Sequence, residues 1–93
     1  MADNWQQRIL ENYEALAVAI DYDLGFEASL DAFKEFQTFV DVMREMKDEP
    51  PISKTQMLLD FVRTGSDRLF EILCHCLNTN CKRHIVSTYL KHR

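Results

Sequence analysis

Glycine and proline are scarce in this chain, with two of each in 93 residues, and the prolines are adjacent, Pro50 and Pro51. A β-sandwich or β-barrel joins many short strands through turns that depend on such residues, so their scarcity argues against an all-β fold. Hydrophobic residues make up 46% of the chain and charged residues 28%. This balance excludes a disordered chain, which has low hydrophobicity, and it predicts a compact all-α domain.

The chain also lacks an apolar run near the roughly 20 residues that a membrane-spanning helix needs. Its first residues, MADNWQQ, are polar and acidic and do not have the pattern of a signal peptide. Three cysteines, Cys74, Cys76 and Cys81, cannot all pair within one chain. We therefore expect free thiols in a soluble, cytoplasmic protein.

The net charge of −4 is unevenly distributed along the chain. Residues 1–50 contain twelve acids against four Lys or Arg, a net charge of −8, whereas residues 51–93 contain three acids against seven, a net charge of +4. This asymmetry is compatible with a random split of surface charge. It is also compatible with docking to an oppositely charged partner, or with self-association between copies.

The spacing of apolar residues predicts six short helices with tight turns, which form one antiparallel bundle over residues 1–93. The first helix is expected to start at a cap on Asp3 and to continue to a break at residues 21–25. Its inner face is formed by Ile9, Tyr13, Leu16 and Ile20.

The second and third predicted helices each have an apolar side and an acidic side. In the second helix the apolar stripe is Phe26, Leu30 and Phe33, and the opposite side carries Glu27, Asp31 and Glu35. A cap at Thr38 is expected to start the third helix. Its inner face is Phe39, Val42, Met43 and Met46, and its outer face is Asp41, Glu45 and Asp48.

The remaining three helices follow the two prolines. Ser53 with Gln56 has the pattern of a capping box for the fourth helix, and Gly65 is expected just after its end. The fifth helix is apolar around most of its circumference, so it should be central, with Leu73 in the core next to Leu16, Leu58 and Phe70. Residues 78–80 form a predicted turn before a sixth helix that carries Ile85, Val86, Tyr89 and Leu90.

No pattern indicates catalysis or a cofactor. Cys74 and Cys76 project about 200° apart on a helix, so they cannot share one metal ion with His75, His84 or Cys81, and Cys74 should be the more accessible of the two. The basic residues of the last helix are not interleaved with aromatic residues and the domain is acidic, which argues against nucleic-acid binding. We expect neither an enzyme nor a metal protein.

The residues do resemble one family. The stretch MLLDFVRTGSDRLFEIL, residues 57–73, resembles the caspase recruitment domain (CARD), in which a leucine-rich helix ends in a basic-Gly turn before a helix with a buried aromatic. Residues 9–20 resemble the first helix of the CARD in the apoptotic protease-activating factor, and the overall pattern is similar to the CARDs of that protein and of initiator caspases. Residues 80–90 resemble the last CARD helix, although Asn80 and Cys81 stand where the family commonly has Gly.

This resemblance implies a six-helix, Greek-key death fold with a first helix bent into two pieces. It also implies a module without catalytic activity that recruits a caspase or adaptor through CARD–CARD contacts in apoptotic or inflammatory signalling. By this resemblance the acidic partner-binding face comprises Glu27, Asp31, Glu35, Asp41 and Glu45. The basic partner-binding face comprises Arg8, Lys54 and Arg63. The alternatives are a death-effector, pyrin or death domain, which share the fold, or a helical scaffold that binds an amphipathic peptide in an apolar groove.

Overall fold

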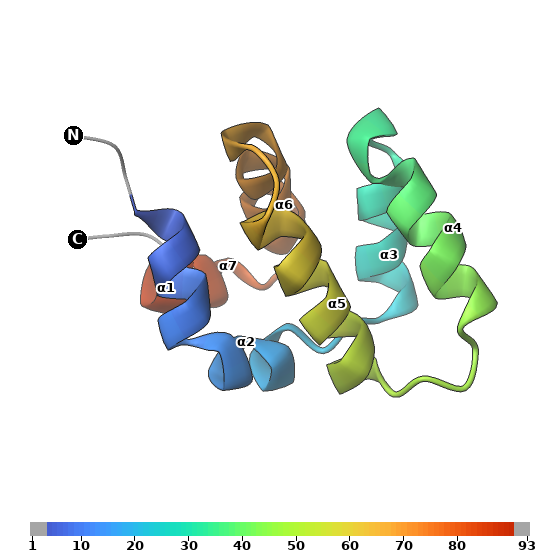
Figure 1. The fold of residues 1–93 in the computed structure, drawn as a ribbon, viewed down its shortest axis with the longest axis horizontal. Helices are drawn as coiled ribbons and strands as arrows, with labels where there is room; N and C mark the ends of the chain where they lie inside the picture. Colours follow the sequence, from blue (N-terminus) through green and yellow to red (C-terminus); the bar gives the residue numbers. More distant parts are fainter. Residues whose placement is uncertain (1–3, 91–93) are drawn as a thin grey trace.

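The computed structural model describes residues 4–90, and within that range all regular structure is helical. The elements are α1 (Trp5–Glu11), α2 (Tyr13–Ile20), α3 (Leu24–Asp31), η1 (Lys34–Phe36), α4 (Gln37–Glu45), α5 (Pro51–Arg63), α6 (Asp67–Thr79), α7 (Arg83–Ile85) and η2 (Val86–Leu90). The molecule extends 38 × 25 × 23 Å, with α4 at one end and α1 and α7 at the other (Figure 1). The prediction of an all-α fold is therefore confirmed.

The first predicted helix is interrupted at Asn12, which separates α1 from α2. The Asn12 side-chain amide donates to the carbonyl of Arg8 at 3.0 Å, and the Asn12 backbone leaves the helical region at φ −112° and ψ 20°. A short polar side chain that bonds the backbone competes with helix continuation. The N-cap of α1 is Asn4, whose side chain accepts from the amide of Gln7, while the predicted cap Asp3 lies outside the described residues.

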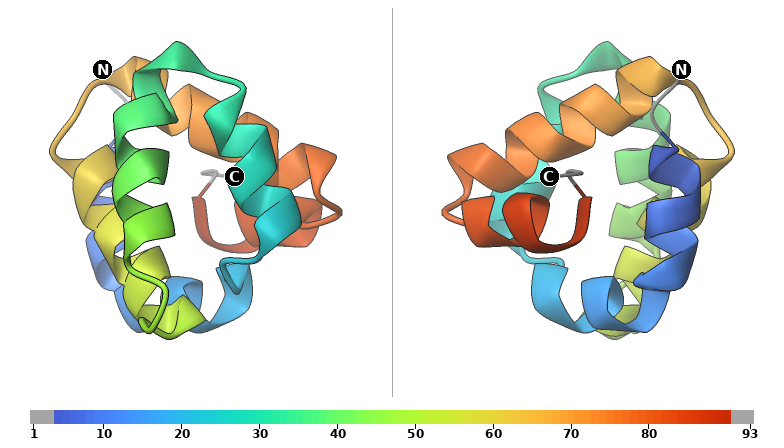
Figure 2. Two further views of the ribbon diagram at one scale, coloured as in Figure 1. Left: turned by 90° about the vertical axis from the view of Figure 1, so that its right-hand side faces the viewer. Right: turned by 90° about the vertical axis from the view of Figure 1, so that its left-hand side faces the viewer.

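Helix α3 is fixed at its start by a side-chain cap. Asp23 accepts a hydrogen bond from the amide of Phe26 at 2.8 Å, and its other oxygen lies 3.4 Å from Nζ of Lys82. Beyond the end of α6, Asn80 donates to the hydroxyl of Ser29 at 2.8 Å. These contacts hold the segment just after α6 against the start and the second half of α3, and the two helices pack against each other (Figure 2).

Two predicted helix starts are wrong. Helix α4 begins at Gln37 without a side-chain cap, so Thr38 lies inside it, and the predicted core residue Val42 is 45% exposed while Val40 is buried. Helix α5 begins at Pro51, so Ser53 lies inside the first turn and does not cap it. Proline is well tolerated at the first helical position because the amide hydrogen it lacks has no partner there.

Helix α6 packs against α3, α5, α7 and η2, and it forms the centre of the molecule. The four residues predicted to lie together in the core are buried, because Leu16, Leu58 and Leu73 are fully buried and Phe70 is 6% exposed. The ring of Phe70 stacks on Trp5 at 4.8 Å between centroids. Gly65, just after α5, packs closely on Leu69 of α6, whose side chain would have to shift to make room for a Cβ there.

The end of α6 differs from the prediction of a turn at residues 78–80, because the helix continues to Thr79. Cys81 then adopts a left-handed conformation at φ 62°, and the amide of Lys82 donates back to the carbonyl of Leu77 at 2.8 Å. This is the Schellman arrangement, which usually has glycine at the left-handed position. The last predicted helix is short: α7 is followed by η2, a π-helical segment.

Candidate interaction surface

The predicted acidic face begins with Glu27, and here the structure corrects the prediction. Glu27 is only 5% exposed. Its carboxylate accepts a hydrogen bond from the Tyr22 hydroxyl at 3.0 Å and one from Nε of Arg44 at 3.3 Å. Burial raises the pKa of Tyr22 well above its ordinary value, and the adjacent Glu27 carboxylate adds to the rise. Glu27 therefore joins α3 to α4 from inside and cannot contact a partner.

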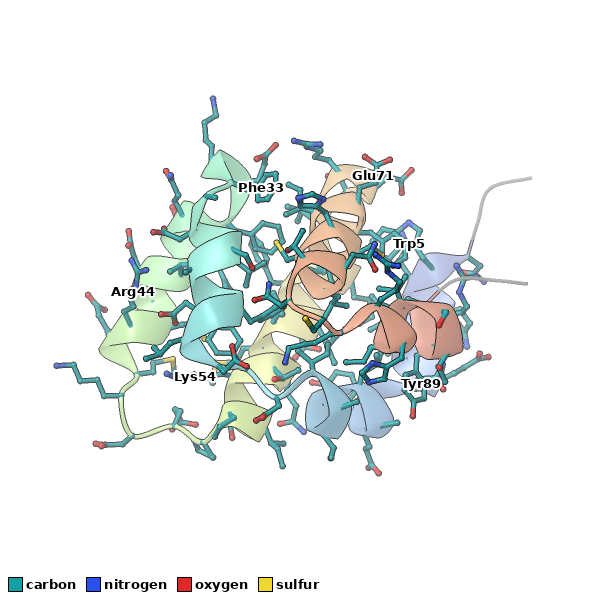
Figure 3. All side chains as sticks on the ribbon, turned by 180° about the vertical axis from the view of Figure 1, so that it is seen from behind. Trp5, Phe33, Arg44, Lys54, Glu71 and Tyr89 are labelled. Carbon is teal, nitrogen blue, oxygen red and sulfur yellow. The ribbon has the colours of Figure 1, made fainter. Side chains whose placement is uncertain are left out.

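Arg44 also neutralises a second predicted site residue. Its terminal nitrogen lies 3.3 Å from Oδ2 of Asp31, so one half-exposed guanidinium bridges two carboxylates of α3. The Arg44 side chain is labelled in Figure 3. A buried carboxylate needs such a partner, because leaving it unpaired away from water is strongly unfavourable. The charge of Asp31 is thus largely neutralised by Arg44 within the domain.

Glu35 is the third predicted acid, and it joins η1 to α6. Its carboxylate accepts from Nε of Arg68 at 3.1 Å. A hydrogen bond from its own backbone amide and the Arg68 side chain together lower the pKa of Glu35. Glu35 is exposed, but its charge is paired with that of Arg68 in the same domain.

The two remaining acids, Asp41 and Glu45, are exposed on α4 and one helical turn apart. Neither has an ion pair or a side-chain hydrogen bond with another residue of the described range 4–90. Val42, next to Asp41, is 45% exposed. We call Asp41, Val42 and Glu45 the α4 acidic surface. It lies on the outermost helix of the bundle (Figure 1).

The three residues of the predicted basic face come from two helices, and each of them makes contacts within the domain. Nε of Arg8 donates to the carbonyl of Leu90 at 2.7 Å, at the contact between α1 and η2. Lys54 and Arg63 are nine residues apart on α5, or about 13 Å along the helix axis. Nζ of Lys54 lies 5.9 Å from the ring of Tyr22, and Arg63 pairs with Asp60 at 3.8 Å. Each of these cations therefore already has a structural contact.

The cysteines show a second correction. Both Cys74 and Cys76 are buried, and Cys81 is exposed. Cys74 is not the accessible thiol that was predicted, because neighbouring elements cover α6 on more than one side. Burial raises the pKa of the Cys76 thiol, which keeps it protonated and unreactive. Among residues 4–90, no group of three or more His, Cys, Asp or Glu side chains is placed to hold a metal ion.

Two surface hollows were not predicted from the sequence. One, of about 260 Å³, is lined by Phe33, Arg68, Glu71, Ile72 and His75. The other, of about 320 Å³, lies at the α1–α2 break and is lined by residues 10–15. The apolar spacing assigned Phe33 to the core, but the side chain is only partly buried, and no local pattern distinguishes the rim of a hollow from the core.

Comparison with known proteins gives no match: no family model, no curated protein and no solved structure is similar to this chain. None of the helices in the described part of the chain combines the length and the apolar character that a membrane crossing requires. The α4 acidic surface is therefore the feature of the described residues on which a proposal of function can be based.

Proposed function

We propose that this domain is a CARD-like, death-fold interaction module that acts in the cytoplasm and recruits a caspase or an adaptor through the α4 acidic surface. The observation that carries the proposal is that Asp41 and Glu45 are exposed without ion pairs in residues 4–90, whereas Glu27, Asp31 and Glu35 are engaged within the domain. Unpaired charges with an exposed Val42 beside them are suited to a partner that supplies cations around an apolar contact.

Three features of the fold support the family assignment. The first helix is interrupted at Asn12, and the CARD resemblance implies a first helix in two pieces. With α1 and α2 counted as one helix and α7 and η2 as one, residues 4–90 contain six helices apart from the short η1, which is the number that the CARD resemblance implies. Cys81 is left-handed at the position where the family commonly has Gly.

The mechanism is electrostatic docking of preformed surfaces, without catalysis. Exposed ion pairs are each worth about 0.2–1 kcal/mol, so two carboxylates alone give weak binding. Linking several copies in one complex raises the overall affinity because later contacts become intramolecular. We therefore propose that recruitment by this domain depends on clustering of either the domain or its partner.

The alternative of a scaffold that binds an amphipathic peptide has less support. Such a site needs a continuous apolar groove. The large apolar side chains exposed in the described range are single residues on five different helices: Leu10, Val18, Leu24, Val42 and Ile52. The other death-fold subfamilies have the same helical architecture, so only partner choice separates them from a CARD.

Partner choice can be tested with a panel of recombinant CARD, pyrin, death-effector and death domains, each immobilised separately. We expect this domain to be retained by at least one CARD with a basic surface and to be released by 500 mM salt, which screens charge pairs. Retention only by another subfamily would contradict the CARD assignment. Binding that is insensitive to salt would contradict electrostatic docking.

A further inference from the structure

The hollow between η1 and α6 carries an inference beyond the α4 acidic surface. Its volume is about 260 Å³, and none of its lining residues belongs to α4. Phe33, just before η1, and Glu71, from α6, lie at the upper edge of the molecule in Figure 3, whereas Arg44 of α4 lies at its left side. The hollow is therefore a separate site.

The walls of this hollow are held in place by their own contacts. The ring of His75 meets the ring of Phe33 edge-on at 5.7 Å, and Ile72, at 1% exposure, closes the floor. The Arg68 guanidinium lies 6.0 Å from the centre of the Phe33 ring, while its Nε donates to Glu35 at 3.1 Å. Because these groups are already fixed, an occupant would order few side chains on binding.

The two charged side chains that line the hollow, Arg68 and Glu71, differ in whether they have an ion-pair partner. Arg68 is paired with Glu35, but the exposed carboxylate of Glu71 has no ion pair or hydrogen bond with any side chain in residues 4–90. The hollow thus offers an apolar floor, a guanidinium at one wall and an unused hydrogen-bond acceptor at the rim.

The volume of the hollow and the chemistry of its lining residues together indicate which side chain would fit it. Pockets for small molecules are usually about 300–1,000 Å³, so 260 Å³ suits one large side chain. An aromatic ring presents its negative face to Arg68 and packs on Phe33 and His75, and a hydroxyl or indole N–H at its tip can donate to Glu71. A leucine would leave Glu71 unpaired, and an arginine would place a second cation beside Arg68.

We propose that the Phe33 hollow, lined by Phe33, Arg68, Glu71, Ile72 and His75, is a docking site for a tyrosine or tryptophan side chain of a different protein. The occupant is not expected from a second copy of this chain, because none of the large apolar side chains exposed in residues 4–90 is aromatic. Tyrosine and tryptophan are also the residues most enriched at the energetic centres of interfaces.

The proposal can be tested by titrating the ¹⁵N-labelled domain with N-acetyl-tyrosinamide and N-acetyl-tryptophanamide and following amide chemical shifts. We expect saturable shifts at residues 33, 68, 71, 72 and 75, with a dissociation constant on the order of 1–10 mM for a single residue. N-acetyl-leucinamide and N-acetyl-argininamide should bind at least about threefold more weakly. Equal shifts with all four probes, or no shifts in this hollow, would overturn the proposal.

Substitutions separate this site from the α4 acidic surface. Glu71→Ala should weaken N-acetyl-tyrosinamide binding about three- to tenfold, as expected for loss of a hydrogen bond to a charged group, and Glu71→Gln should weaken it less. The matched control Glu45→Ala removes an exposed carboxylate of α4 and should have no effect. Unchanged binding in Glu71→Ala, or shifts in the free protein that grow with its concentration, would overturn the assignment. Neither result bears on partner recruitment by α4.

Discussion

Glu27 illustrates how a single residue can be misplaced by sequence pattern. It was predicted to face solvent with Asp31 and Glu35, but at about 100° per residue it lies only about 60° from Leu30, at the edge of the apolar stripe. It is buried, because Tyr22 and Arg44, which lie outside α3, cover that side and satisfy its oxygens. Helical periodicity describes one element, and it contains no information on which neighbouring elements pack over its polar side.

The buried position of Glu27 leads to a stability prediction. Glu27→Ala should lower the free energy of unfolding by about 2–4 kcal/mol, because it leaves the Tyr22 hydroxyl without its acceptor and removes one of the two carboxylates that Arg44 bridges. Urea unfolding followed by circular dichroism measures this change. Glu45→Ala, which removes an exposed carboxylate, should change the free energy by less than about 0.5 kcal/mol. Equal effects of the two substitutions would show that Glu27 is not held in a buried network.

At the scale of the elements, apolar spacing located the helices but not all of their ends. The central position of α6 followed from apolar residues around its circumference, and Phe70 and Leu73 were correctly predicted to be buried, although Cys74 was not. The ends depend on local backbone bonds, and several residues can compete for them. Pro51 and Asn12 determine a helix start and a helix break, while the predicted caps Thr38 and Ser53 lie within helices.

The end of α6 provides a test of backbone strain. Cys81 is the left-handed residue of the Schellman motif, a conformation that disfavours side chains by roughly 1–2 kcal/mol. Cys81→Gly should therefore raise the free energy of unfolding by about 0.5–1 kcal/mol, after the larger chain entropy of unfolded glycine is subtracted. Cys81→Ala is the matched control, because it removes the thiol and retains the Cβ. If alanine stabilises as much as glycine, the thiol and not the backbone is responsible.

The start of α3 should make stability depend on pH. The hydrogen bond from the Phe26 amide, and then the Lys82 charge, lower the pKa of Asp23 in the folded domain. A lowered folded pKa means that the stabilisation is present above the ordinary Asp value and is lost as pH falls through the lowered value. Between about pH 6 and pH 2, the wild type should therefore lose more stability than Asp23→Asn, which retains a capping side chain. Parallel urea midpoints for the two proteins would contradict this cap.

At the scale of the whole molecule, part of the acidic excess stays exposed without ion pairs, whereas much of the basic excess is paired within the domain. The excess of acid in residues 1–50 leaves Asp41 and Glu45 exposed without ion pairs in residues 4–90. The excess of base in residues 51–93 is partly engaged inside the domain, since Arg63, Arg68 and Lys82 pair with Asp60, Glu35 and Asp23. The sequence could predict the excess charge but not its pairing, because most of the partners lie far apart along the chain. An acidic docking role is consequently better supported than self-association through a basic patch.

The most direct test of the account is the dissociation constant for a basic-surfaced CARD obtained from the panel, measured by calorimetry at 150 mM salt. Asp41→Lys with Glu45→Lys should weaken binding at least about 100-fold, because like charges that meet across an interface cost several kcal/mol. The matched double reversal Glu11→Lys with Glu14→Lys makes the same change in net charge on α1 and α2, and it should stay within about threefold of the wild type. Equal losses in the two variants, or binding that survives reversal of the α4 acidic surface, would contradict docking through α4.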